Sequence, residues 1–320
     1  MGEGHAGASV QSTLERQRKA LWSVRPKHVA ALAQSTQALC LDQMQEITYR
    51  DLTSLSDFAT VVDLEQAIWG PGYTEPVPVP ILAVTVKRGG ILIGAFDGLR
   101  MIGFVYSLAG LTGGRPMQWS HMAGVVDQFR NAGIGYRLKL LQRERALQMG
   151  LDLIEWTYDP LQAMNAHLNF TKLGVVVEEY EENVYGASQS PLHRGNPTDR
   201  FVAEWRIGAP HVVRRVGAPD IPLRTHEIAD VPRANRALPS GEWHECSALD
   251  LGIDDRRLIV EIPMGFTEML ANAPDLAFAW RMDTRRIFAT YFARGFRAVD
   301  FLLDRNGRKG AYLLVRHLKL

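Results

Sequence analysis

The sequence predicts an α/β protein in which a mixed, mostly antiparallel sheet is flanked by helices. Two hairpin signals, at residues 97–98 and 113–114, separate three apolar stretches and indicate an antiparallel meander. The third stretch turns straight into a periodic helix through Gly133 and Gly135. Later stretches repeat the order strand, helix, strand, strand, which predicts a C-terminal α+β half-repeat.

Composition excludes several classes of protein. The chain has 320 residues, 46% hydrophobic and 22% charged, which is ordinary for a globular protein of about two domains. Its 36 Lys and Arg against 35 Asp and Glu give a formal charge of +1, so nothing points to nucleic acid. Cys40 and Cys246 stand far apart, so neither a disulfide framework nor a metal cluster is expected, and a cytoplasmic location fits. No apolar run is long enough to span a bilayer.

The first predicted elements follow a polar extension at residues 1–45. A short strand is expected at 46–52, and an amphipathic helix at 54–70, where apolar residues recur at helical spacing until Gly70. A Pro/Gly-rich loop then leads to residues 81–90, which fit a helix or a strand. The strands of the meander are expected at 91–97, 101–110 and 117–126.

The later elements fall into two groups separated by an irregular stretch. A helix is expected at about 135–149, and then come a strand at 151–160, a helix at 161–174 and strands at 175–186 and 199–207. The last third offers a strand at 257–263, a helix at 275–294 and a hairpin at 296–316. Because residues 209–240 are rich in Pro, Arg and Ala, we expect a first domain at 46–208 and a second at 209–320.

The stretch from Val125 to Lys139 carries the strongest functional signal. A helix begins with unpaired backbone N–H groups and the positive end of its dipole, so a strand that turns directly into a helix can bind a pyrophosphate. Gly133 and Gly135 would let a phosphate approach the main chain, and Arg130 adds positive charge. The alternative is an ordinary strand-to-helix turn in which the glycines only permit close packing.

In this context residues 46–208 resemble the GNAT superfamily of acyl-CoA-dependent N-acyltransferases. The resemblance is carried by Gly124-Val125-Val126, by the Arg130-x-x-Gly133-x-Gly135 turn and by the later helix that ends in "NFTKLG". The stretches "WTYDPLQAMNAHLNFTKLG" and "NPTDRFVAEW" are similar to a poorly characterised branch that carries a C-terminal extension. Some members of that branch are linked with N-succinylation of amino acids.

The resemblance implies which residues bind the co-substrate, acetyl-CoA or succinyl-CoA. It implies that backbone amides of the turn hold the pyrophosphate, and that the edge of the preceding strand pairs with pantetheine. Side-chain amides at Asn165 and Asn169, four apart on one predicted helix face, would help, the alternative being a polar helix surface. The implied cofactor residues are Gly124, Val125, Val126, Arg130, Asn131, Ala132, Gly133, Ile134, Gly135, Tyr136, Asn165 and Asn169. No metal is expected.

Acyl transfer to an amine needs a base for the amine, a polarised thioester carbonyl and an acid for the thiolate. The resemblance places the polarising amide at Val125 or Val126. A tyrosine often serves as the acid at the position of Phe170, which has no proton to give. Tyr291 occupies the corresponding place in the half-repeat, where it is expected to be a packed aromatic rather than a displaced acid.

Candidate catalytic residues gather at the end of the strand before that helix: Glu155, Tyr158 and Asp159. Asp159 could accept a proton or bind the cationic amine, or it could cap the helix that begins near Pro160. Glu155 lies on the same strand face and could act through water, although a salt-bridged or solvated Glu is the stronger expectation. His121, on the motif strand, is expected to be a satisfied core histidine.

Candidate acceptor-binding residues are Trp69, Tyr185 and Arg200. Trp69 would form a wall of the pocket or pack the helix end, and Arg200 would pair with a substrate carboxylate or form a structural salt bridge. Arg281 and Arg285 share a predicted helix face and could reach an anionic acyl group, or be solvated. The C-terminal unit is expected to cap the acceptor side or to form a dimer surface.

The sequence thus predicts an acyl-CoA-dependent N-acyltransferase that acts on a small amine or amino acid, without nucleic acid, membrane or metal. The acyl group would be acetyl or succinyl, and a homodimer is an open alternative to a monomer. One rival is a CoA-binding regulatory protein with weak chemistry, which Phe170 supports. Another is a transferase that acts on a protein or peptidoglycan amine.

Overall fold

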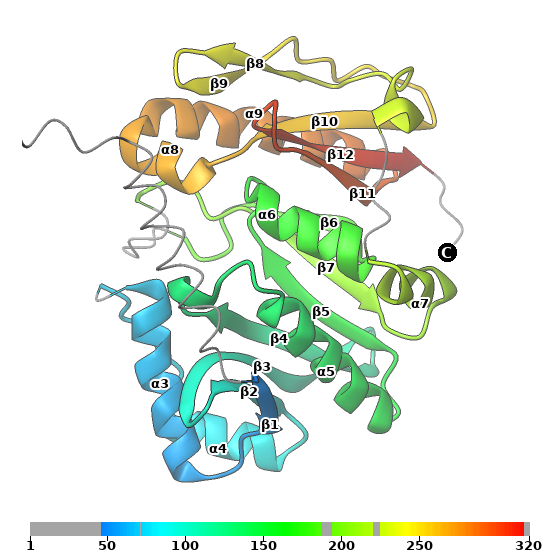
Figure 1. The fold of residues 1–320 in the computed structure, drawn as a ribbon. Helices are drawn as coiled ribbons and strands as arrows, with labels where there is room; N and C mark the ends of the chain where they lie inside the picture. Colours follow the sequence, from blue (N-terminus) through cyan, green and yellow to red (C-terminus); the bar gives the residue numbers. More distant parts are fainter. Residues whose placement is uncertain (1–45, 71, 187–193, 220–224, 317–320) are drawn as a thin grey trace, which may run out of the picture. The chain divides into compact units, whose positions relative to one another are not determined.

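A ten-stranded sheet runs through the described part of the chain in the computed structural model (Figure 1). The structure describes residues 46–70, 72–186, 194–219 and 225–316, so the predicted extension at 1–45 lies outside them. The strands follow the order β1-β2-β3-β4-β5-β7-β6-β11-β12-β10. Their bounds are β1 Thr48–Asp51, β2 Ile91–Asp97, β3 Arg100–Thr112, β4 Arg115–Val125, β5 Leu153–Tyr158, β6 Val176–Glu181, β7 Arg200–Arg206, β10 Arg257–Pro263, β11 Phe296–Asp304 and β12 Lys309–Arg316.

Helices and a small hairpin accompany this sheet. The hairpin pairs β8 (Arg236–Ser240) with β9 (Trp243–Ser247). The α-helices are α3 Leu55–Trp69, α4 Val79–Lys87, α5 Ile134–Gln148, α6 Ala163–Ala166, α7 Pro210–Gly217, α8 Phe266–Asn272 and α9 Pro274–Ala293. The 3-10 turns η1 (Asp127–Phe129) and η3 (Thr225–Ile228) and a π-helix, η2 (His167–Leu173), complete the described elements. The predicted fold class, a mixed and mostly antiparallel sheet flanked by helices, is confirmed.

Local signals explain where α3 and α4 begin. The Ser54 side chain accepts a hydrogen bond from the Asp57 amide at 3.1 Å, and the Asp57 carboxylate accepts one from the Ser54 amide at 3.3 Å. This reciprocal capping box fixes the start of α3. The undecided stretch at 81–90 belongs largely to the helix α4, which has a proline in its first turn.

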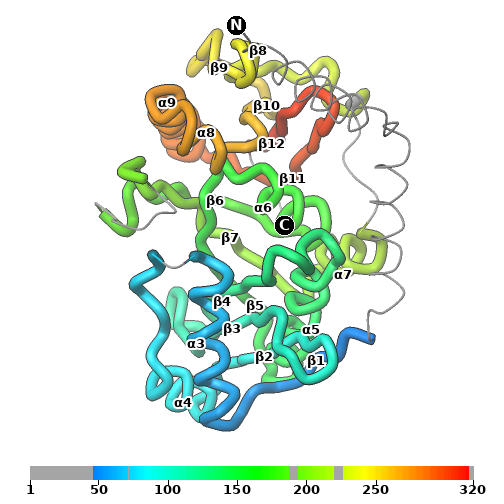
Figure 2. Tube along the Cα trace, turned by 60° about the vertical axis from the view of Figure 1, so that its left-hand side comes forward, coloured from blue at the N-terminus to red at the C-terminus, as the bar shows by residue number. Residues whose placement is uncertain are grey.

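The predicted half-repeat is confirmed in its topology. In the first unit β7, the last strand in sequence, lies between β5 and β6; in the second, β12 lies between β10 and β11. The two units join where β6 pairs antiparallel with β11, through the single residue pair Val177–Ala298. Figure 2 shows the two groups of strands following one another along the sheet.

The described residues from Tyr49 onward, apart from residues 97–99, group as one compact unit. One sheet includes strands from both sides of residue 208. The domain boundary predicted there stays a prediction. The neighbouring stretch, expected to be irregular, instead contains α7, which begins at Pro210 with the proline in the first turn.

Aromatic side chains build the core beside the join between the units. Phe201 of β7 contacts Phe288 of α9 with ring centroids 4.6 Å apart, and Tyr312 of β12 with centroids 5.4 Å apart. Phe170 of η2 meets the same Tyr312 ring edge-on at 5.6 Å. All four side chains are fully buried, so both halves share one apolar core.

Candidate active site

The strands β4 and β5 separate soon after they meet, which leaves a split between them beyond Trp119 and Glu155. They run parallel and pair only at Gln118–Ile154 and Trp119–Glu155. From Ser120 to Val125, this edge of β4 has no strand partner among the described residues. An open edge of this kind presents backbone N–H and C=O groups to whatever lies beside it.

Hydrogen-bond alternation shows which peptide groups face the open edge. The Val126 amide donates to the Ile102 carbonyl at 2.9 Å, so Gly103 and Val125 form a non-hydrogen-bonded pair. The peptide groups of Val125 and Ala123 therefore point away from β3. This removes Val126 from the two candidates for the polarising amide, because its N–H is already used, and it leaves Val125.

A β-bulge lies in β4 at the start of the open edge. Ser107 of β3 pairs with Ser120 and its neighbour Tyr106 pairs with Met122, so His121 is the extra residue. The His121 side chain is exposed, and the Tyr106 ring meets it edge-on at 5.9 Å. The prediction of a satisfied core histidine is wrong, because the bulge turns this residue out of the sheet.

The predicted pyrophosphate turn leads from β4 through η1 to α5. Asn131 and Gly133 both adopt left-handed backbone conformations, with φ of 64° and 81°. The amides from residue 131 to residue 135 donate no backbone hydrogen bond to any described residue. An added Cβ at Gly133 or Gly135 would meet no atom within 4 Å, so the alternative in which the glycines permit close packing does not apply.

Arg130 folds back onto the strand end instead of extending over the turn. Its Nε donates to the Val125 carbonyl at 3.2 Å, and a terminal nitrogen lies 2.7 Å from the Asp127 carboxylate. The Asp127 carboxylate neutralises part of the Arg130 charge, and only part because solvent screens this largely exposed group. The turn thus offers mainly backbone groups and only part of the Arg130 charge.

A buried lysine that the sequence reading missed lies behind the split. Lys139 of α5 is 5% exposed, and its Nζ donates to the Ser120 hydroxyl at 2.8 Å and to the Gln142 side-chain oxygen at 3.2 Å. It also stands 3.7 Å from the centroid of the Trp156 ring on β5. Burial lowers the pKa of Lys139 to about 7.

Asp159 is held at both carboxylate oxygens. One oxygen accepts the Leu161 amide at 2.9 Å within the turn before α6, and the other accepts Arg281 Nη2 at 2.6 Å. Asp159 is therefore not the predicted helix cap, because α6 begins only at Ala163 and its N-cap residue is Gln162. Arg281 is 1% exposed, so this is a buried ion pair. These contacts give Asp159 a structural role in the turn and in the ion pair, and Arg281 is neither solvated nor free to bind an acyl group with that nitrogen.

Tyr158 and Glu155 occupy different surroundings. The Tyr158 hydroxyl is buried with no hydrogen-bond partner among the described residues, and burial raises its pKa well above the ordinary value. Glu155 lies opposite Glu204 in the β5–β7 ladder, and burial followed by repulsion from Glu204 raises its pKa. Because alternate residues face opposite sides of a strand, the two side chains do not converge.

The two asparagines of the later helix do not share a face. Asn165 of α6 is exposed, whereas Asn169 of η2 is buried. Asn165 lies in the short helix α6 and Asn169 in the π-helix η2, so the regular helix that the expectation assumed is not present. Asn169 instead lies close enough to Tyr158 to affect its pKa.

The three predicted acceptor residues lie on α3, in the turn after β6 and at the start of β7. Trp69 packs against Tyr73 at 5.3 Å between ring centroids, and its ring would lie 3.5 Å from a Cβ added to Gly124. The Arg200 guanidinium stands 5.2 Å from the Tyr185 ring centroid. The Tyr185 and Thr157 hydroxyls share a hydrogen bond of 3.2 Å, which brings this pair to β5.

The remaining candidates of the half-repeat have structural contacts. Arg285 donates twice to Asp199, at 2.6 and 2.9 Å. Although burial disfavours its charged form, hydrogen bonds from Arg285 and Tyr180 lower the pKa of Asp199. Tyr291 is buried and its hydroxyl donates to the Asp250 carbonyl at 2.8 Å, so the expectation of a packed aromatic is met.

A second buried charge that sequence reading missed is Glu65 of α3. Its side chain is 0% exposed; one oxygen accepts the Val77 amide at 3.1 Å, and the other has no partner among the described residues. Burial raises the pKa of Glu65 to about 7. The signal was present, because an acid stands four residues after Val61 on the apolar face of a predicted helix.

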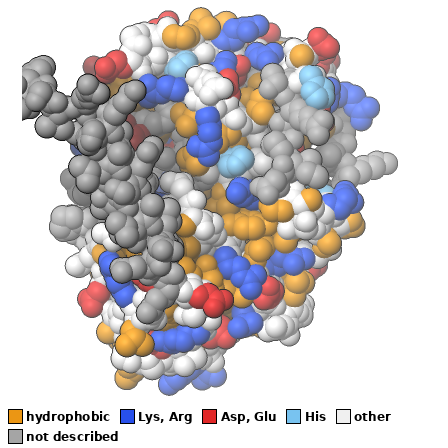
Figure 3. Space-filling model, in the orientation of Figure 1, with side chains coloured by type: hydrophobic (Ala, Val, Ile, Leu, Met, Phe, Trp, Pro, Cys, Tyr) orange, Lys and Arg blue, Asp and Glu red, His pale blue; other side chains and the backbone are white. Residues whose placement is uncertain are grey.

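The surface around the split combines apolar and basic side chains. Hydrophobic side chains gather in the middle of the face drawn in Figure 3, between the places of α6 and α5 in Figure 1, with Lys and Arg side chains beside them. No group of three His, Cys, Asp or Glu side chains that could hold a metal occurs within the described ranges. No helix among them is long and apolar enough to cross a membrane.

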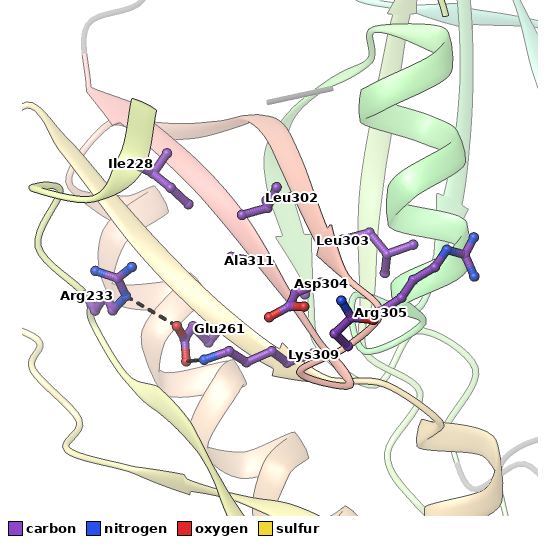
Figure 4. A pocket seen from close by; sticks show the side chains of 11 residues that line it. Ile228, Arg233, Glu261, Leu302, Leu303, Asp304, Arg305, Lys309 and Ala311 are labelled. Carbon is purple, nitrogen blue, oxygen red and sulfur yellow. Dashed lines mark hydrogen bonds and ion pairs between the residues drawn. The ribbon is translucent and has the colours of Figure 1, made fainter. Parts of the chain in front are cut away.

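A separate cavity of about 610 Å³ lies in the C-terminal half (Figure 4). Ile228, Leu302 and Ala311 contribute apolar walls, and Glu261 stands at the charged end. The Glu261 carboxylate lies 3.3 Å from Arg233 Nε and 2.9 Å from Lys309 Nζ, as the dashed lines show. These charges satisfy one another, and the cavity shares no lining residue with the β4–α5 turn.

Comparison with known proteins gives similarities to solved structures alone. No protein-family model matches the chain, and no curated protein matches it. The chain is similar to a GNAT-family acetyltransferase from Streptococcus pneumoniae, with 18% identity over 50% of this chain and 98% of that one and a TM-score of 0.42. It is similar to the ribosomal-protein-S18-alanine N-acetyltransferase from Escherichia coli, with 13% identity over 51% and 96% and a TM-score of 0.41.

A third similar structure is a putative acetyltransferase from Salmonella typhimurium with its cofactor acetyl-CoA. It has 16% identity over 52% of this chain and 98% of that one, with a TM-score of 0.41. All three of these structures are described as acetyltransferases or putative acetyltransferases. Since the TM-scores lie below 0.5, these likenesses carry no argument about the activity of this chain.

Proposed function

We propose that this chain is an acyl-CoA-dependent N-acyltransferase that binds the CoA pyrophosphate at the turn before α5. The observation that carries the proposal is Gly135, a glycine in the first turn of a helix where neither packing nor a left-handed backbone requires one. The unpaired amides of residues 131–135 and the positive end of the helix dipole suit an anion there.

The open edge of β4 supports a place for pantetheine. The peptide groups of Ala123 and Val125 point toward the split, where the amides of an extended arm would pair as an added strand. The thioester would then lie beside the bulge at His121, and the Val125 amide would polarise its carbonyl. The reaction is direct attack of an amine on the thioester, and the CoA thiol is acidic enough to leave as thiolate.

The paired arginines favour acetyl over succinyl as the acyl group. Arg285 is bound by Asp199, and Arg281 by Asp159, so the nitrogens that would receive a succinyl carboxylate are largely occupied. The acceptor is a small amine or amino acid that approaches on the side of Tyr185. A homodimer and a cytoplasmic location remain part of the proposal.

A second candidate is a CoA-binding protein without acyl transfer. Phe170 is buried and lacks a hydroxyl, and Asp159 is held by Arg281, so two of the expected catalytic groups are absent or occupied. This candidate predicts CoA binding at the same turn but no thiol release with any amine.

Calorimetric titration of CoA into wild type, Gly135→Ala and Gly217→Ala tests the cofactor site. Gly217 ends α7, and a Cβ there would also meet no atom within 4 Å, so it is a matched control. We expect Gly135→Ala to weaken CoA binding at least about tenfold, since a methyl group would occupy the place of the phosphate. Equal affinities in all three proteins would contradict the proposal.

A further inference from the structure

The carboxyl group of Glu65 is buried with one oxygen unused. Oε2 accepts a hydrogen bond from the amide of Val77, in the segment before α4, at 3.1 Å, while Oε1 has no partner among the described residues. A carboxylate oxygen without a partner in the protein interior costs free energy. A functional role is one reason why a protein keeps such a group. No cation among the described residues compensates for it.

The position of Glu65 relates it to the open edge of β4. α3 packs against β3 and β4 (Figure 2), and its Ile68 lies so close to Gly124 that an added Cβ would stand 2.8 Å away. Glu65 lies one turn earlier in the helix, near Tyr106, whose pKa it helps to raise. Since Tyr106 pairs with Met122, the carboxyl group stands at the level of the bulge.

Side chains on this face reach across the split to β5. Tyr73 packs against Trp69 of α3, and its pKa is raised by burial first and then by the nearby charges of Glu65, Glu75 and Tyr185. Tyr185 in turn shares a hydrogen bond with Thr157 of β5. Trp156, the neighbour of Thr157, faces Lys139 of α5 instead. The Glu65 face is thus opposite to the face that carries the predicted pyrophosphate helix.

We propose that Glu65 is the general base that takes a proton from the acceptor amine. The inference deepens the proposed function and depends on it. The ammonium form of the acceptor gives one proton to Glu65, and the free amine attacks the thioester carbonyl. The C–S bond breaks as the amide forms, and the proton that the nitrogen must still lose goes to the CoA thiolate. Glu65 gives its proton to water that enters after the product has left.

The surroundings of Glu65 suit this role better than those of the other acids near the split. Burial raises its pKa to about 7, near which a base accepts and releases protons readily. The titratable groups that face it are Tyr73, Tyr106 and, beyond them, Glu75 and His121. Asp159, by contrast, is bound by Arg281.

The test compares wild type with Glu65→Gln and with Asp63→Asn, an exposed carboxyl on the same helix. Thiol release from acetyl-CoA is measured against a panel of amino acids of both hands, with CoA binding measured in parallel. We expect Glu65→Gln to lower kcat about 10²–10⁴-fold, to leave CoA affinity unchanged, and to remove the rise of kcat/KM with pH near 7. Asp63→Asn should behave as wild type, and Glu65→Asp should regain part of the rate.

The outcomes separate the two proposals. If Glu65→Gln retains the wild-type rate and pH profile, or if Asp63→Asn loses as much, Glu65 is not the base and the transferase assignment stands. If wild type binds CoA but releases no thiol with any amine, acyl transfer is refuted, and the role of Glu65 falls with it.

Discussion

Arg281 of α9 donates a hydrogen bond of 2.6 Å to Asp159, so a residue of the C-terminal half neutralises the charge at the end of β5. The side chains are 2% and 11% exposed. The second terminal nitrogen of Arg281 is buried without a partner among the described residues, and its Nε donates to Asn196 at 3.2 Å. The pair therefore fixes the end of β5 and depends on both halves of the chain.

Removing Arg281 should destabilise the protein strongly. Arg281→Met leaves Asp159 buried and unpaired, which we expect to cost about 3–5 kcal/mol, whereas the double variant with Asp159→Asn should lose less. Urea denaturation measures these differences. Arg115→Ala, which breaks an exposed pair with Asp152, should cost under about 1 kcal/mol; a similar loss from both arginines would contradict the assignment.

Gly124 should matter for packing, in addition to its predicted place beside the cofactor. A Cβ at this position would lie 2.8 Å from Ile68 Cδ1 and 3.1 Å from its Cγ2, so Gly124→Ala should force the Ile68 side chain to shift and cost about 1 kcal/mol. Thermal unfolding of Gly124→Ala with and without Ile68→Ala checks this. The second substitution should recover part of the loss if the clash is the cause, and should add a further loss if it is not.

Lys139 should make stability depend on pH on the alkaline side. Its pKa is lowered from 10.5 to about 7 by burial, so the unfolded state binds more protons between these values. Stability should rise with pH from about 7 to 10 and be flat below 7. Lys139→Met should remove this slope, and Ser120 and Gln142 would still bond each other at 3.1 Å. Lys87→Met, at the exposed end of α4, should retain it.

Glu65 should give a slope of opposite sign on the acid side. Its pKa is raised from 4.5 to about 7 by burial, so the native state binds more protons in that interval and stability falls as pH rises through it. The change should be on the order of 2 kcal/mol after allowance for screening by solvent. The midpoint of urea denaturation at pH 5, 6 and 7.5 measures this change. The midpoint should fall with rising pH in wild type and stay nearly constant in Glu65→Gln. A slope that persists in that variant would assign it to another group.

Elements with local signals were predictable from the sequence. The Ser54–Asp57 capping box and the glycines of the β4–α5 turn act within a few residues of themselves and mark helices that the sequence predicts. The helix α7, which begins at Pro210, lies in a stretch that was expected to be irregular. The half-repeat was visible because strand and helix order recurs in sequence. Its spatial order, with β12 between β10 and β11, follows the same pattern as the first unit.

The charges of the candidate site were not predictable, because their partners lie far away in sequence. Arg281 and Asp159 are separated by 122 positions, and nothing near either residue announces the other. Glu65 stands on the apolar face of the predicted helix at 54–70 and so had a sequence signal, whereas the burial of Lys139 depends on how α5 packs on the sheet. The different burial of Asn165 and Asn169 likewise depends on how α6 and η2 pack, which their spacing does not give.

The single residue pair that joins β6 to β11 has a consequence for truncation. With so short a backbone connection, side chains must hold the C-terminal half in place: Tyr312 donates to the Pro160 carbonyl at 2.6 Å, and Thr171 to the Phe301 carbonyl at 2.9 Å. A chain cut after residue 208 would expose the ring of Phe201 to water and leave Asp159 without its cation. The second half is therefore an integral part of the first one's interior, and separate expression of residues 46–208 should yield aggregated protein.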